Sequence, residues 1–152
     1  MGGATSANQY EGAYLEDRKG LSNVDLIPSG SQRLDVARGE LDPKLLPDTA
    51  KFPARSAVDG YHHFKEDIAF MAKMNFKVYR FSISWSRIFP NGDDEQPNMA
   101  GLKYYEQVID ECLKYDIEPL ITINHFDVPH NLIVKYDSWR NRKLIDFYLR
   151  LC

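Results

Sequence analysis

Two hydrophobic periods alternate along this chain, and their order limits the folds that it can adopt. Apolar and polar side chains alternate through residues 76–85, which predicts a β-strand, because successive side chains of a strand point to opposite faces. Apolar residues at spacings of three and four occur on either side of it, in residues 61–71 and 102–112, and this spacing predicts amphipathic helices. Residues 118–125 carry apolar side chains on both alternating faces, which is typical of a buried parallel strand.

The predicted elements follow one another as strand, long loop, helix, strand, helix, strand, helix. The first strand is expected within residues 2–12, and the first helix runs from Ser56, which with Asp59 resembles a capping box, to about Asn75. The last helix begins after Trp139, with Ile145, Tyr148 and Leu149 on its apolar side. This order requires parallel strands joined by right-handed crossovers, so the chain is predicted to be an α/β structure.

Two parallel architectures fit this order. A doubly wound nucleotide-binding domain commonly has a glycine-rich turn from its first strand into a helix, and the chain contains no such motif. A (β/α)₈ TIM barrel gathers polar residues from the carboxyl ends of its strands on one rim, and Gln9, residues 80–87 and residues 124–127 occupy such ends. Because a full barrel needs about 250 residues, we expect residues 1–152 to supply the first three β/α units of one catalytic domain, without a separate second domain.

Residues 13–55 show no sustained period and contain four of the eight prolines. Loops longer than about 15 residues are uncommon inside compact domains and are either functional walls and lids or disordered segments. We therefore expect a wall of a binding site after the first strand, with disorder as the alternative.

Composition limits the partners of the chain. A net charge of −3 with scattered Lys and Arg argues against a nucleic-acid partner, and no apolar run approaches the roughly 20 residues of a membrane-spanning helix. Cys112 and Cys152 lack a CxxC spacing, which favours reduced thiols. No secretory leader precedes Gly2, so we expect a cytoplasmic protein, and the oligomeric state stays open.

Several long stretches together resemble the N-terminal third of a glycoside hydrolase family 1 enzyme. They are GGATSANQYEGA, DGYHHFKEDIAFMAKMNFKVYRFSISWSRIFPNG, GLKYYEQVIDECLKYDIEPLITINHFDVP and DSWRNRK. Their shared order and spacing make the resemblance specific, and it covers nearly the whole chain. Within the family, NQYEGAY, EDRKGLSNVD and HFDVPH are most similar to the bacterial 6-phospho-β-glucosidase branch.

The resemblance implies retaining hydrolysis of β-glucosides, with 6-phospho-β-glucosides as the expected substrates. In that reaction one carboxylic acid protonates the glycosidic oxygen and a second carboxylate attacks the anomeric carbon. The two glutamates of the family follow its fourth and seventh strands, so the resemblance puts both beyond Cys152. We therefore expect residues 1–152 alone to be inactive, and we expect no cofactor and no metal.

Supporting residues also carry over by resemblance. Gln9 resembles the glutamine that hydrogen-bonds hydroxyls of the glycon, and His125 resembles the histidine that contacts a neighbouring hydroxyl. Arg80 resembles the arginine that keeps the nucleophile ionised, since a nearby cation favours a charged carboxylate. A buried unpaired guanidinium is costly, so we expect a carboxylate to face Arg80. Trp85 and Arg87 are interpreted as residues that pack and anchor loops.

Each assignment has a plainer alternative. Without the resemblance, Gln9 is interpreted as a solvated amide and His125 as a hydrogen-bonded core histidine. A catalytic pair within residues 1–152 would have to be Glu11 with Asp127, and nothing in the sequence favours this pair over structural capping. The alternative function is a non-catalytic sugar-binding module that uses Gln9 and His125.

Overall fold

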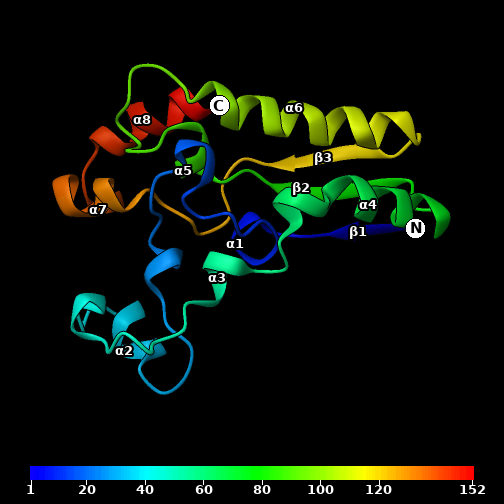
Figure 1. Cartoon of the computed structure of the whole chain (residues 1–152). Helices are drawn as coiled ribbons and strands as arrows, with labels where there is room; N and C mark the ends of the chain where they lie inside the picture. Colours follow the sequence, from blue (N-terminus) through cyan, green and yellow to red (C-terminus); the bar gives the residue numbers. More distant parts are fainter.

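A three-stranded parallel sheet lies at the centre of the computed structural model, which describes residues 1–152 (Figure 1). The strands are β1 (Gly2–Ala4), β2 (Val78–Ser82) and β3 (Glu118–Thr122), and they lie side by side in the order β1-β2-β3. Ala4 is in register with Arg80, and Arg80 with Leu120. All three strands therefore end at the same edge of the sheet.

Two long helices connect the strands, and shorter helical segments follow the strand ends. The long helices are α4 (Gly60–Lys73) and α6 (Met99–Lys114). The shorter ones are α1 (Ala7–Tyr10), α2 (Arg33–Ala37), α3 (Pro53–Ser56), α5 (Trp85–Ile88), α7 (His130–Tyr136) and α8 (Lys143–Leu151), with 3₁₀ turns η1 (Glu16–Arg18), η2 (Val24–Leu26), η3 (Pro43–Leu45) and η4 (Ser138–Arg140). None of these helices has the length and apolarity that crossing a bilayer requires.

The hydrophobic core lies between the sheet and one layer of helices. Tyr79 and Phe81 of β2 face this layer and are buried. Their partners in the core include Phe64 and Ile68 of α4 and Tyr104, Tyr105, Val108 and Cys112 of α6. The other face of the sheet is open, so that Arg80 is exposed and Leu120 is 54% exposed. Helices on one face only are expected for a barrel wall and not for a doubly wound sheet, which has helices on both faces.

Some predicted boundaries differ from the observed ones. The first strand ends at Ala4, because the chain turns into the helical segment α1 directly after Ser6. The predicted capping box is absent: Ser56 ends α3, and Asp59 precedes α4 in a left-handed conformation without a side-chain cap hydrogen bond. Ala57 separates the two helices with φ 47° and ψ −126°, a region that side chains other than glycine rarely adopt.

Two apolar faces are more exposed than predicted. β3 was expected to be buried on both faces, but Leu120 and Ile121 are both exposed, because no element of these 152 residues covers them. In α8 the fully buried residue is Leu144, whereas Ile145 and Leu149 are exposed. The helix α7, which the periodicity did not predict, lies between β3 and α8.

The long segment between α1 and α4 has two parts. Its first part runs along the chain that follows β3: Ser22 forms an antiparallel bridge with Pro129, and the Asn23 amide donates to the Val128 carbonyl at 2.9 Å. The part around α2 projects away from the sheet (Figure 1). The segment is thus a series of short turns, and its first part forms a wall beside the carboxyl edge of the sheet.

Candidate functional site

Polar residues gather where the three strands end. The chain continues from these ends into α1, into α5 and into residues 123–129, all at the same edge of the sheet (Figure 1). The Ala7 amide donates to Ser82 Oγ at 2.8 Å, and Asn8 Nδ2 donates to the His125 carbonyl at 3.4 Å. These bonds hold the segment after β1 against the ends of both other strands.

The three residues assigned by resemblance lie at this edge or on the open face. Gln9 is exposed in α1, where its Oε1 accepts from Ser6 Oγ at 2.8 Å. His125 is half-buried, with its ring 4.8 Å from that of Phe126. Arg80 donates through Nε to Thr122 Oγ1 at 2.7 Å and has no ion pair with a carboxylate. No hydrogen bond joins any two of these three residues.

Glu11 and Arg87 form a buried ion pair. Arg87 is 0% exposed and donates through Nε to Glu11 Oε2 at 2.8 Å and through Nη2 to the Gly12 carbonyl at 3.2 Å. The Tyr105 hydroxyl donates to the other Glu11 oxygen at 2.5 Å, and burial, followed by the negative charge of Glu11, raises the pKa of Tyr105 well above its usual range. The guanidinium also lies 4.2 Å from the centre of the Tyr61 ring. Glu11 is therefore a structural anion, which supports the interpretation of Arg87 as an anchor.

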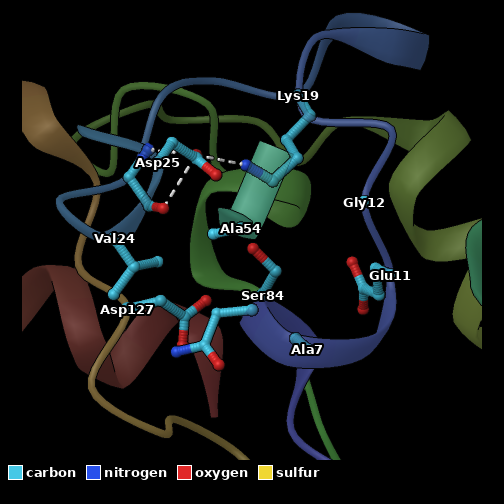
Figure 2. A pocket seen from close by; sticks show the side chains of 11 residues that line it. Ala7, Glu11, Gly12, Lys19, Val24, Asp25, Ala54, Ser84 and Asp127 are labelled. Atoms are coloured by element: carbon cyan, nitrogen blue, oxygen red, sulfur yellow. Dashed lines mark hydrogen bonds and ion pairs between the residues drawn. The ribbon is translucent and has the colours of Figure 1, made fainter. Parts of the chain in front are cut away.

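Asp127 lies beside a small polar cavity (Figure 2). Its side chain is 1% exposed, and neither of its carboxylate oxygens has a hydrogen-bond partner within the chain. The cavity has a volume of about 10 Å³, which is close to the least space that one water molecule needs. Burial, followed by the nearby charge of Glu11, raises the pKa of Asp127 to about 7. Glu11 is held by Arg87 and Tyr105, so the pair Glu11 and Asp127 lacks a free nucleophile.

Lys19 and Asp25 close the cavity from the long segment. Lys19 Nζ lies 2.7 Å from Asp25 Oδ2, and both side chains are buried. Asp25 also accepts from the amide and the hydroxyl of Ser22 at 2.8 Å. The sequence analysis missed this pair, since a Lys and an Asp six residues apart in an aperiodic segment carry no distinguishing pattern. No cluster of three or more His, Cys, Asp or Glu side chains is arranged to hold a metal ion.

Parallel strands with helices on one face and polar residues at the carboxyl edge are features of the barrel class of enzymes. The model of glycosyl hydrolase family 1 matches residues 1–152. The chain belongs to that family.

Its relatives include 6-phospho-β-glucosidases. AscB of Escherichia coli (strain K12) is 53% identical over 149 residues, which cover 98% of this chain and 31% of AscB. A 6-phospho-β-glucosidase of Clostridium longisporum is 51% identical, with coverage of 98% and 30%. The crystal structure of the rice β-glucosidase Os3BGlu6 is similar with a TM-score of 0.82 and 39% identity, over 99% of this chain and 28% of that one. The chain thus spans about 30% of the length of the curated relatives that it matches.

Proposed function

We propose that residues 1–152 are the N-terminal part of a retaining β-glycosidase that, when complete, hydrolyses 6-phospho-β-glucosides. The observation that carries this proposal is the identity of 53% and 51% to two 6-phospho-β-glucosidases across 98% of the chain. The chain spans only about 30% of those relatives. The proposal therefore assigns the other barrel units and both catalytic glutamates to the portion that it does not span.

In this proposal Gln9 and His125 bind hydroxyls of the sugar, and Arg80 keeps the nucleophile ionised. The position of Arg80 supports its assignment. The residue is exposed on the open face of the sheet, and no carboxylate of residues 1–152 forms an ion pair with it. In a closed barrel this face would become the interior. The substrate is then a small glycoside, the reaction needs no cofactor, and the expected location is the cytoplasm.

A chimera tests the proposal. This chain would replace the 149 matching residues of E. coli AscB, and hydrolysis of p-nitrophenyl 6-phospho-β-glucoside would be measured. We expect an active chimera, in which Gln9→Ala and His125→Ala each lower kcat/KM about 10- to 100-fold, since leaving a hydroxyl of the reacting sugar without its partner costs about 1–3 kcal/mol. The matched controls are Gln107→Ala and His63→Ala, which change exposed residues of α6 and α4, and we expect them to keep full activity.

The isolated chain gives a second test. We expect no turnover of p-nitrophenyl β-glucoside, plain or 6-phosphorylated, because Glu11 is held in an ion pair and Asp127 is buried. Clear hydrolysis that disappears in Glu11→Gln, with the fold preserved by circular dichroism, would overturn the proposed division of the catalytic machinery. Glucoside binding without turnover would support the alternative of a sugar-binding module only if the chimera is also inactive.

A further inference from the structure

The charges buried around the small cavity do not balance. Five ionisable side chains of this region, Glu11, Lys19, Asp25, Arg87 and Asp127, are each at most 7% exposed. Two ion pairs account for four of them: Lys19 with Asp25 at 2.7 Å and Arg87 with Glu11 at 2.8 Å. Asp127 is the one carboxyl group left without a cation. A buried unpaired charge costs several kcal/mol, and such groups commonly become neutral instead.

The lysine that lines the cavity already has hydrogen-bond partners of its own. Lys19 Nζ donates to Asp25 Oδ2 at 2.7 Å and to the Gly20 carbonyl at 3.2 Å. In Figure 2, Lys19 and Asp25 lie on the far side of the cavity from Asp127, and Ser84 lies between. With a volume of about 10 Å³, the cavity has room for about one water molecule and not for a hydrated cation. A proton on Asp127 is therefore the simplest way to neutralise this site.

Asp127 is also surrounded by the bonds that attach the long segment to the end of β3. Asn23 Oδ1 accepts from the Val128 amide at 2.8 Å, Asn23 Nδ2 donates to the Phe126 carbonyl at 3.3 Å, and the His130 amide donates to the Leu21 carbonyl at 2.8 Å. A negative charge on Asp127 would be created inside this attachment and near the charge of Glu11. It would thus weaken the contact between the two segments.

We propose that Asp127 is a buried proton-binding site, and that its proton stabilises the docking of residues 19–25 on the chain that follows β3. This proposal is independent of the catalytic role proposed above, because it concerns the cohesion of the wall and not the sugar. The groups that face Asp127 are Glu11 from the end of α1, and Lys19 and Asp25 from the long segment, with Arg87 of α5 behind Glu11.

The direction of the pH dependence follows from these neighbours. Burial and then the charge of Glu11 raise the pKa of Asp127 to about 7. Its own backbone amide, the Ser84 hydroxyl and, least of all, the positive charge of Lys19 favour the charged form and oppose this rise. The unfolded chain has the ordinary pKa of about 3.9. Because the folded pKa is the higher one, the stabilisation is complete below about pH 4 and is lost as the pH rises through 7.

The direct test is a titration of the 152-residue chain. The carboxyl carbon of Asp127, assigned by through-bond NMR in the wild-type chain, is followed by its ¹³C chemical shift from pH 4 to 9. We expect a midpoint between pH 6 and 8. A midpoint near 4 would overturn the proposal, and this readout does not depend on the folding of any variant.

The second test compares urea unfolding of the wild-type chain with that of Asp127→Asn, which keeps the shape and removes the charge. Between pH 5 and 8 we expect the unfolding constant of the wild type to rise roughly 10- to 100-fold more than that of the variant. Asp146→Asn, at an exposed carboxylate of α8, is the matched control and should follow the wild type. Equal pH dependence of wild type and Asp127→Asn would overturn the proposal. Stabilisation of the wild type at pH 8 by NaCl but not by choline chloride would also overturn it, because a bound cation and not a proton would then neutralise Asp127.

Discussion

The ion pair between Glu11 and Arg87 gives the sharpest prediction for the stability of this chain. Two unit charges 2.8 Å apart attract each other by about 6 kcal/mol at an effective dielectric constant of 20. The loss of hydration of both groups cancels much of this attraction, so the net contribution of the pair is small. Removal of one partner is different, because the other charge stays buried without compensation, at a cost of about 3–5 kcal/mol.

We therefore expect Glu11→Gln to lower the free energy of unfolding by about 3 kcal/mol. This loss lies at the lower end of the range of about 3–5 kcal/mol, because the amide oxygen of the introduced glutamine can still accept from Arg87 Nε or from the Tyr105 hydroxyl. The double variant Glu11→Gln with Arg87→Met should cost no more than Arg87→Met alone, which corresponds to a coupling energy of about 3 kcal/mol or more. Urea unfolding followed by circular dichroism measures all three variants.

A surface pair provides the control. Glu16 Oε2 lies 3.0 Å from His62 Nε2, but both side chains are about half exposed, and exposed pairs contribute at most about 1 kcal/mol. Glu16→Gln should therefore change the free energy of unfolding by less than 1 kcal/mol. Equal losses in Glu11→Gln and Glu16→Gln, or strictly additive losses in the double variant, would refute the reasoning.

Two further predictions concern local features. Ala57→Gly should raise the free energy of unfolding by about 1 kcal/mol in urea titrations, because its φ of 47° and ψ of −126° suit glycine and strain alanine. Ala69→Gly in the interior of α4 should lower it by a similar amount, and a loss in both variants would contradict the assigned strain. At pH 8, iodoacetamide should modify the exposed Cys152 rapidly and Cys112 only after unfolding, as detected by mass spectrometry. The reason is that Cys112 is fully buried, and burial raises its pKa to about 11. Equal rates for both thiols would contradict this assignment.

The sequence predicted best those strands and helices that have one face against the core and the other face exposed. In β2, Tyr79 and Phe81 pack on helices while Arg80 faces outward, so the alternation matches the burial as far as Phe81. Ser82 departs from it, because this residue is buried where its hydroxyl accepts from the Ala7 amide. The helix α6 was predicted for the same reason. This helix ends at Lys114, and Asp116 follows with a φ of 55°, which Asp tolerates better than most residues.

Other features depend on contacts between distant segments. In α8 a spacing of three and four fits both Ile145 with Leu149 and Leu144 with Tyr148, and packing decides between them: the Tyr148 ring lies 5.6 Å from that of Trp85 in α5. The apolar pattern of β3 does not depend on whether a neighbour covers the strand, so Leu120 and Ile121 were predicted to be buried.

The candidate site shows the same limit. The sequence analysis singled out Arg80 as the arginine that needs a carboxylate, which it expects from the complete barrel. Within residues 1–152 the arginine paired with a buried carboxylate is Arg87, whose partner Glu11 lies 76 residues away. Only the parallel order of the strands brings these two residues together. For Asp127 the sequence indicated a position at the strand end. That Asp127 has no partner could not be predicted, because Lys19 pairs with Asp25 instead, and both of these residues come from a segment without periodicity.

The sheet order also has a consequence for synthesis. A cluster of 15 buried residues already lies between the sheet and its helices, whereas the outer edge of β3 is paired with no strand of residues 1–152 and can receive a further strand. A β/α unit of about 30 residues leaves the ribosome in roughly 2–6 s at 5–20 residues per second. In a longer nascent chain, this edge would serve as a template for the next β/α unit, and a pause in translation here would prolong the time in which two nascent chains can pair incorrectly.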